Sequence, residues 1–231
     1  MRVTAESLRA FRLFRGASAA SLEPLASRCH AVSLRSGEAV FAAGAPATNL
    51  VLVTAGLARV VFRGGGGDPS TLAIFGPRDV VGLPAALEAG AYPADAEVVS
   101  KVASIALVPA HLLRSLAEAD PKVLRGVNDA LLEHTRILRA KIDVMTAADV
   151  EQRLARLLAH LLVRFGDERE DGSALLPILL QRRQLAELVG ARVETVIRTM
   201  RRWGAEGLVT SDKGGMCVLE PAELEKRARR S

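Results

Sequence analysis

The order of apolar and polar residues changes twice along this chain of 231 residues. Between about residues 30 and 109, short apolar runs alternate with turn-forming residues, as in VSLRSGEAVFAAGAPATNLVLVTAGLARVVF. Runs of this length predict strands, and Gly37, Gly44 and Gly56 follow them at positions where only glycine turns at low cost. We therefore expect a jelly roll or a related double-sheet barrel, with a flexible hairpin tip in GGGGDP at residues 64–69.

Helical spacing begins at Asp120 and Pro121, because proline suits the first turn of a helix. The side chains of one edge then recur three and four positions apart, a heptad pattern over roughly three repeats. An apolar stripe this narrow is typical of a coiled-coil dimer interface. The alternative is that the stripe packs into the core of its own domain. The predicted interface consists of Leu124, Val127, Leu131, His134, Leu138 and Met145, with Lys141, or Ile142 if the heptad drifts, before the last of them.

A second helix is predicted over VEQRLARLLAHLLVRF, residues 150–165, with its leucines on one face. The short polar segment 146–149 before it is predicted to be a hinge, and residues 166–174 after it a solvated loop. These boundaries predict three parts: a β-rich domain with flanking helices (1–119), a long helix with its hinge (120–148) and a C-terminal domain (149–231).

The C-terminal domain has the pattern of two helices joined by a tight turn. QRRQLAELVG predicts a short amphipathic helix that ends at Gly190, where a left-handed residue closes the last turn. A second helix follows at once, and EGLV and TSDKGGMCVLEP then predict two short strands around a Lys-Gly-Gly turn. This order is typical of a winged helix-turn-helix, which binds DNA. The residues expected to face inward are Leu185, Leu188, Val189, Val196, Met200 and Trp203.

The outer face of the second helix carries side chains that can read bases. Arginine matches O6 and N7 of guanine, and glutamate accepts a hydrogen bond from N4 of cytosine. Glu194 and Arg198 are one turn apart and could read one step together, whereas an ordinary i,i+4 salt bridge is the alternative. Val193 could contact a thymine methyl group. Phosphate contacts are predicted for Arg182, Arg183, Thr195, Arg201, Arg202 and Lys213.

Composition narrows the classes of function. The 31 basic and 26 acidic residues give a net charge of +5, which permits a polyanionic partner without requiring one. Cys29 and Cys217 are far apart and form no CxxC, so we expect reduced thiols in a cytoplasmic protein and no zinc or iron-sulfur site. Long apolar runs are absent, which argues against secretion and membrane spanning. The sequence also lacks HxH, GxSxG, HExxH and P-loop motifs, which argues against an enzyme.

Nearly the whole chain resembles the superfamily of the cyclic-AMP receptor protein and the fumarate and nitrate reductase regulator (CRP/FNR), which are bacterial transcription factors. The resemblance lies in LRSGEAVFAAGAPATNLVLVTAGLARVVF, LAIFGPRDVVG and LVGARVETVIRTMRRWGAEGLV. The E-T-x-x-R pattern of the family's recognition helix matches Glu194, Thr195 and Arg198. Val193 is similar to the fumarate and nitrate branch, whose serine before the arginine is replaced here by Ile197, so the outer bases of the half-site are expected to differ.

This resemblance implies an α+β fold with an N-terminal β-roll (a cyclic-nucleotide-binding-like jelly roll), a long dimerisation helix and a C-terminal winged helix-turn-helix. It implies a homodimer on a palindromic DNA operator with a TGA-like core in each half-site. RNA polymerase would be a further partner if the protein is an activator.

The ligand site departs from the family. Cyclic-nucleotide binders have a glutamate for the ribose, where this chain has Leu83 after Gly82, and an arginine for the phosphate, where it has Pro93. Ala94 and Asp95 follow, and a buried phosphate needs a cation that an aspartate would oppose. These residues argue against cyclic AMP as the effector. The expected effector pocket consists of Gly82, Leu83, Pro93, Ala94 and Leu138.

Three interpretations of the sensor domain stay open: a small apolar or uncharged effector, haem as in gas-sensing relatives, or no ligand. Haem would need an axial ligand, for which the candidates are Cys29, His30, His111, His134 and Met145. Apart from haem, no metal is expected. An alternative of another class is a dimeric scaffold with a vestigial winged helix, which would not bind DNA specifically.

Overall fold

The computed structural model describes residues 2–63, 69–178, 180–212 and 214–229. The chain forms two compact units, Met1–Asp68 with Ala73–Arg136, and Pro69–Leu72 with Ile137–Ser231. The division falls inside helix α5 (Pro121–Met145), so the two units share this helix. The boundaries expected from the sequence place the same helix in a segment of its own.

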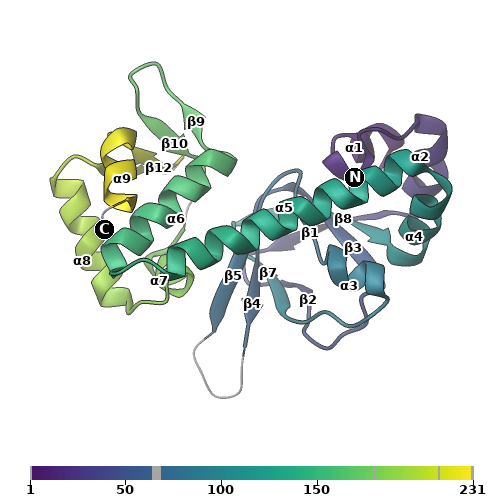
Figure 1. The fold of residues 1–231 in the computed structure, drawn as a ribbon, viewed down its shortest axis with the longest axis horizontal. Coiled ribbons are helices and arrows are strands. Elements are labelled where there is room, and N and C mark those ends of the chain that lie inside the picture. Colours follow the sequence, from purple (N-terminus) through teal and green to yellow (C-terminus); the bar gives the residue numbers. More distant parts are fainter. Residues whose placement is uncertain (1, 64–68, 179, 213, 230–231) are drawn as a thin grey trace. The chain divides into compact units, whose positions relative to one another are not determined.

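The strands of the first unit lie between His30 and Pro109, where the apolar runs predict them. They form two antiparallel sheets with the orders β1-β8-β3-β6 and β2-β7-β4-β5, which confirms the expected β-roll (Figure 1). Gly37, Gly44 and Gly56 all have positive φ, as their turns require. Residues 64–68 of the predicted hairpin tip lie outside the described residues. The strands are β1 (His30–Arg35), β2 (Ala39–Phe41), β3 (Asn49–Ala55), β4 (Ala58–Phe62), β5 (Ser70–Phe75), β6 (Val80–Val81), β7 (Asp95–Val98) and β8 (Val102–Pro109).

Short helices cover this β-roll and share one apolar core with the first half of α5. The core joins Leu8, Phe14 and Leu22 near the N-terminus to Leu113 and to Val123 on α5. These helices are α1 (Ala5–Arg9), the 3-10 turn η1 (Arg12–Phe14), α2 (Ala19–Ala26), α3 (Leu83–Glu88) and α4 (Ala110–Ala119).

The surface of α5 differs in part from the predicted dimer interface. Val127 is only 4% exposed and belongs to the core of its own unit, and Leu131 packs partly against the same core. His134 is half-buried with its ring 6.4 Å from that of Phe75, and burial lowers its pKa. Including Val127 in the interface was therefore wrong, because the heptad pattern merged an inward with an outward edge. The large apolar residues that α5 exposes are Leu124 (49%), Leu132 (57%), Leu138 (40%), Ile142 (63%) and Met145 (38%).

The second unit contains the predicted winged helix-turn-helix and two features that the sequence did not indicate. The segment expected to be a loop, residues 166–174, contains β9 and the first residue of β10. β10 pairs with β9 and β12, and its side chains of Ala174 and Leu176 are buried. A last helix, α9, follows the wing. The elements are α6 (Val150–Phe165), β9 (Asp167–Glu168), β10 (Ala174–Leu176), α7 (Arg182–Val189), α8 (Val193–Ala205), β11 (Val209–Asp212), β12 (Gly215–Val218) and α9 (Pro221–Ala228).

Gly126 lets α5 approach the N-terminal segment closely. A Cβ at this position would lie 1.9 Å from the carbonyl oxygen of Leu13, so the helix would have to shift. Alanine is a better helix former than glycine by about 1 kcal/mol, but overpacking costs about 1 to 3 kcal/mol or more. We therefore expect Gly126→Ala to lower the free energy of unfolding in urea despite its better helix propensity.

Gly90→Ala is the matched control, because a Cβ at Gly90 meets nothing within 4 Å and should change stability little. A Gly126→Ala protein as stable as the wild type would contradict the close packing of α5.

Candidate nucleic-acid interface

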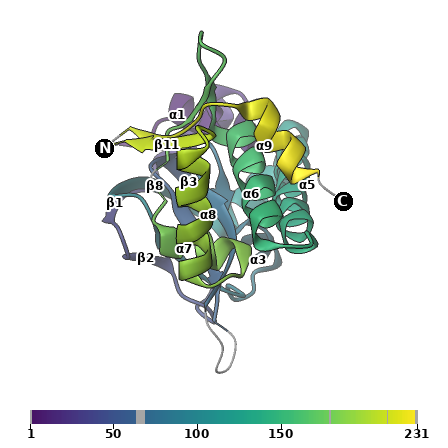
Figure 2. The same cartoon turned by 90° about the vertical axis from the view of Figure 1, so that its left-hand side faces the viewer.

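The helix-turn-helix is built on apolar packing behind α7 and α8. Gly190 ends α7 with φ 61° and ψ 49°, the left-handed geometry expected from the sequence. Val196 and Trp203 on α8 are fully buried and Met200 is nearly so, as their spacing predicts. Figure 2 shows α7, α8 and β11 of this unit side by side. This packing leaves the opposite face of α8 for another molecule.

That opposite face carries charged side chains without partners. Arg192, Glu194, Arg198 and Arg201 are exposed, and none forms a hydrogen bond or ion pair through its side chain within the part of the chain that the structure describes. Glu194 and Arg198 therefore do not form the ordinary i,i+4 salt bridge that was the alternative interpretation. Both side chains are available to a ligand.

The neighbouring candidates are less exposed. Val193 and Ile197 are partly exposed beside the charged residues. Thr195 is half-buried, and its backbone carbonyl accepts a hydrogen bond from Thr199 Oγ1 at 3.0 Å. Two apolar side chains thus adjoin the charged ones on the same helix.

The arginines predicted to contact phosphate fall into different environments. Arg202 lies 2.5 Å from Glu151 and 3.7 Å from Glu206, so carboxylates of its own chain already compensate its charge. Its assignment as a phosphate contact is therefore not supported by the geometry. Arg183 lies 3.3 Å from Glu187 at the surface, and Arg182 is half-buried, which lowers the pKa of its guanidinium. Lys213 lies outside the described residues.

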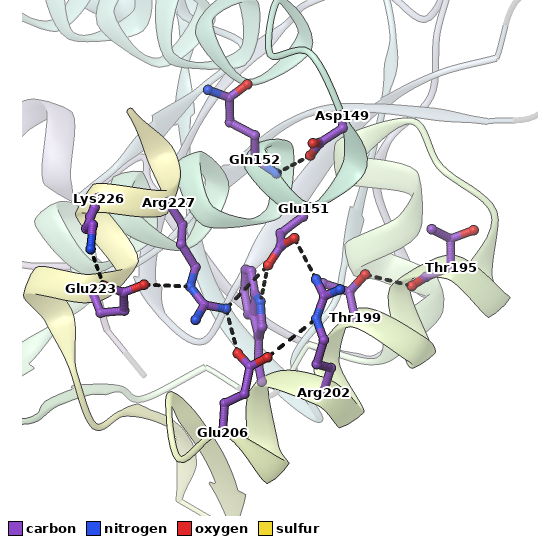
Figure 3. Close-up of polar contacts among 11 residues, drawn as sticks. Asp149, Glu151, Gln152, Thr195, Thr199, Arg202, Glu206, Glu223, Lys226 and Arg227 are labelled. Carbon is purple, nitrogen blue, oxygen red and sulfur yellow. Dashed lines mark hydrogen bonds and ion pairs between the residues drawn. The ribbon is translucent and has the colours of Figure 1, made fainter. Parts of the chain in front are cut away.

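Charged side chains of α6, α8 and α9 form a cluster on the inner side of α8 (Figure 3). Trp203 Nε1 donates a hydrogen bond to Glu151 Oε1 at 2.9 Å. Arg227 of α9 lies 3.3 Å from the same oxygen and 2.8 Å from Glu206. Burial raises the pKa of Glu151, but the hydrogen bonds from Trp203 and Arg202 outweigh it and bring the pKa below its ordinary value. Glu151 is therefore ionised at neutral pH.

The C-terminal end of α7 is held by two cations. Lys141 Nζ donates to the carbonyl of Leu188 at 2.6 Å, and Arg153 Nη1 donates to that of Val189 at 3.3 Å. The last carbonyls of a helix lack partners within it, and the negative end of the helix dipole favours cations there. Burial, helped by the nearby Arg153 charge, lowers the pKa of Lys141 to about 8. Lys141 thus contacts its own chain and is not an outward-facing member of the heptad edge.

In the first unit, an aromatic stack lies beside Gly82, one of the residues expected to correspond to the cyclic-nucleotide cassette. Gly82 has φ 77°, and a Cβ on it would lie 2.9 Å from Tyr92 Cε1. The Tyr92 ring stacks on Phe41 at 3.8 Å, and its hydroxyl donates to the carbonyl of Asn49 at 2.6 Å. Leu83 is 1% exposed and belongs to the core. Leu83 therefore contributes to packing, where the family's nucleotide binders have a polar side chain.

The remaining residues of the expected effector pocket are spread over different environments. Ala94 is buried, and Pro93 next to it is exposed. Leu138 belongs to the second unit and is 40% exposed. Leu83 and Ala94 are thus part of the interior of the first unit, whereas Pro93 is at its surface.

Acidic residues next to the cassette compensate the nearby arginines. Asp95 accepts a hydrogen bond from the backbone of Ala43 at 2.8 Å and pairs with Arg63, and both contacts lower its pKa. Glu97 lies 2.6 Å from Arg59 and 2.9 Å from Arg63. These two guanidinium groups are therefore already paired.

The candidate haem ligands also differ in environment. Cys29 is buried, its thiol donates to the carbonyl of Leu25 at 3.2 Å, and burial raises its pKa to about 11. His30 and His111 are exposed. Among the described residues, no three His, Cys, Asp or Glu side chains are grouped so that they could hold a metal ion. Nor is any described helix long and apolar enough to cross a membrane.

Family models match both units of the chain. One described as a cyclic nucleotide-binding domain matches residues 31–120, and one described as a Crp-like helix-turn-helix domain matches residues 152–227. The chain belongs to the CRP/FNR superfamily. It is a transcription regulator of this type, with a helix-turn-helix DNA-binding domain.

Individual relatives of this CRP/FNR regulator are distant but extend over most of its length. It is 25% identical to the CRP-like cAMP-activated global transcriptional regulator of Mycobacterium tuberculosis, over 94% of this chain and 96% of the relative. It is 29% identical to the cyclic AMP receptor protein of Thermus thermophilus, over 83% and 85%. The structure of FixK2 from Bradyrhizobium japonicum matches with a TM-score of 0.75 and 21% identity, covering 88% of this chain and 98% of that one. The last match shows the fold alone.

Sequence reasoning missed the two clusters that surround the functional residues. Glu151 has the ordinary place of an acidic residue in a first helical turn, and its partner Trp203 is 52 positions away. Tyr92 lies in the alanine-rich segment AGAYPADA, and only the fold brings its ring onto Phe41. The one usable signal was that Trp203, the only tryptophan, needs a partner for its N–H group when buried.

The Lys141 ammonium makes stability depend on pH in this CRP/FNR regulator. Its pKa is about 8 in the folded chain against an ordinary value of 10.5, so between these values the unfolded chain binds a proton that the folded chain does not. The free energy of unfolding contributed by Lys141 should therefore rise with pH across this window. Denaturant titrations of wild type and Lys141→Arg, at one protein concentration and several pH values, measure it.

The arginine variant is the control because its side chain stays charged in both states. The stability of the wild type should increase relative to Lys141→Arg from pH 8 to pH 10.5. A constant difference across the window would show that burial does not disfavour the Lys141 charge.

Proposed function

We propose that this regulator is a homodimer that binds a palindromic DNA operator through α8 and has no catalytic role. The observation that supports this most strongly is the pair Glu194 and Arg198, exposed and without partners in the described chain, on a helix whose other face is buried. Carboxylate and guanidinium groups are the ones that read cytosine and guanine edges. A helix that only faced solvent would be expected to pair them with each other.

Within this proposal the residues of α8 have different roles. Arg198 and Glu194 read base edges, and Val193 and Ile197 make apolar contacts beside them. Arg192 and Arg201 are exposed without partners, and Arg201 contacts phosphate. Arg202 stays in its intramolecular network.

The second copy of the chain covers the exposed apolar edge of α5. Leu138 and Ile142 expose 40% and 63% of their surface, and large apolar side chains in a row on one helix are typical of an interface. Two-fold symmetry of the dimer would then match two half-sites about 34 Å apart. Such a protein would act in the cytoplasm, and it would contact RNA polymerase if it activates transcription.

The effector is proposed to be a small molecule other than cyclic AMP. Asp95 is held as a carboxylate next to the cassette, and Arg59 and Arg63 are paired with carboxylates. A cyclic phosphate would thus lack a compensating cation at these positions. By binding one state more tightly, an uncharged effector would shift α5 and the hinge 146–149, and with them the spacing of the two α8 helices.

Selection from random double-stranded oligonucleotides tests the operator. We expect an enriched inverted repeat, and the absence of any enriched half-site would favour the scaffold alternative. With the selected site, Arg198→Ala should lose about 1 to 3 kcal/mol of discrimination at one base pair. Arg201→Ala should weaken binding to all sequences and reduce the salt slope by about 1.

Arg202→Ala is the matched control one position further along α8. It should leave the salt slope unchanged and lower the free energy of unfolding, because it leaves Glu151 and Glu206 with one cation fewer. If Arg202→Ala and Arg201→Ala had the same effect on the salt slope, the roles given to these two arginines would be wrong.

Calorimetry and an absorption spectrum test the effector. We expect cyclic AMP to release no measurable heat and to leave operator affinity unchanged, since Arg59 and Arg63 are paired with carboxylates and Asp95 would oppose a phosphate. A Soret band in the purified protein would favour haem, and its absence an organic effector or none. Cyclic AMP that binds tightly and raises operator affinity would contradict this assignment.

A further inference from the structure

One carboxylate joins the first turn of α6 to the C-terminal half of α8. Oε1 of Glu151 accepts from Trp203 Nε1 at 2.9 Å, and Oε2 lies 2.5 Å from Arg202. Arg227 lies 3.3 Å from Oε1 and links the same carboxylate to α9. Figure 3 shows the Glu151 side chain between Arg227 and Arg202. Glu151 thus contacts two successive residues of α8 at once.

The backbone at Glu151 is held by the N-terminal cap of α6. The segment 146–149 precedes α6, and Asp149 caps that helix by accepting from the backbone of Gln152 at 2.8 Å. Glu151 lies in the turn that this cap stabilises. The Glu151 side chain is therefore attached to a regular helical backbone, and it is only 26% exposed.

Apolar packing alone does not determine how α8 is rotated and tilted. The contacts of Val196 and Met200 are non-directional, so a small rotation of the helix changes their energy little. The hydrogen bond from Trp203 is directional and weakens steeply as its angle departs from linear. The indole N–H is also buried, so it has no water to replace a lost partner. Base reading needs side chains held to a fraction of an ångström.

We propose that Glu151 is a positioning residue for DNA reading, which fixes the orientation of α8 on α6 through its hydrogen bond with Trp203 so that Glu194 and Arg198 reach the base edges. This inference rests on the proposed function of α8. It assigns Glu151 no contact with DNA.

The ion pairs around Glu151 also affect how strongly the protein binds DNA of any sequence. Glu151, Glu206 and Glu223 are joined to Arg202, Arg227 and Lys226, so three carboxylates are matched by three cations. Removing the Glu151 carboxylate leaves an excess positive charge next to α8. Positive charge strengthens binding to any DNA sequence. Loss of Glu151 should therefore weaken specific binding while leaving non-specific binding equal or slightly stronger.

The test compares three full-length variants with the wild type at one salt concentration. Glu151→Ala removes both the acceptors and the charge. Glu151→Gln keeps one oxygen acceptor for Trp203 but removes the charge and the second oxygen, which faces Arg202. Glu223→Gln is the matched control, because Glu223 pairs with Arg227 and Lys226 and, among the described residues, forms no ion pair or hydrogen bond with α8 through its side chain. Affinities are measured for the selected operator and for a scrambled duplex, and their ratio is the readout.

Trp203 gives an independent spectroscopic readout, because it is the only tryptophan in the chain. Its single indole N–H resonance should shift and exchange faster with solvent in Glu151→Ala. The resonance should stay close to its wild-type position in Glu151→Gln and Glu223→Gln. This measurement reports on the hydrogen bond whether or not DNA is bound.

We expect the ratio of specific to non-specific affinity to fall roughly tenfold or more in Glu151→Ala, about the loss of one correctly read base pair. It should change much less in Glu151→Gln and not in Glu223→Gln. If Glu151→Ala does not fold, Glu151→Gln decides: a ratio that falls tenfold while the indole resonance stays in place would overturn the inference.

A Glu151→Ala protein that loses the hydrogen bond but keeps the wild-type ratio would also overturn it. That outcome leaves the proposed function intact. A wild-type protein that prefers no sequence would instead remove the proposed function itself, and the two failures are therefore distinct.

Discussion

The DNA-binding unit depends on the burial of Trp203, which lies on the inner face of α8. Its indole needs both an apolar site and one acceptor, and Glu151 supplies the acceptor from the first turn of α6. The acceptor is a carboxylate, so it also attracts Arg202 and Arg227. The buried Trp203 ring and the carboxylate that accepts its hydrogen bond thus lie in one network of ion pairs on the inner side of α8.

This network divides the charges of α8 into two groups. Arg202 and Glu206 are neutralised within the chain, whereas Glu194, Arg198 and Arg201 keep their charges without partners among the described residues. A charge that already has a partner gains little from a phosphate, but an unpaired one gains more. Charge composition alone, with an excess of only +5, could not indicate this division. In the proposed function, specificity for DNA depends on which of these charges are left without a partner.

In the first unit, too, burial and ion pairing decide which side chains are available to a ligand. The family's cassette needs polar side chains toward a ligand, but this chain places Leu83 in the core and stacks Tyr92 on Phe41 beside Gly82. The carboxylates of Asp95 and Glu97 pair with the guanidinium groups of Arg63 and Arg59. At these positions the chain therefore has packed apolar side chains and paired charges.

The sequence by itself determined the elements whose signals are local: the strand-length runs, the start of α5 at Pro121, the left-handed Gly190 and the apolar spacing of α8. Such features depend on backbone geometry and periodicity within a few residues. Only the tertiary structure decided that Val127 faces its own core, that Arg202 pairs with Glu151, and that β10 joins the wing. Each of these depends on partners far away in the chain, because burial and ion pairing are properties of packed surfaces and leave no periodic trace in the sequence.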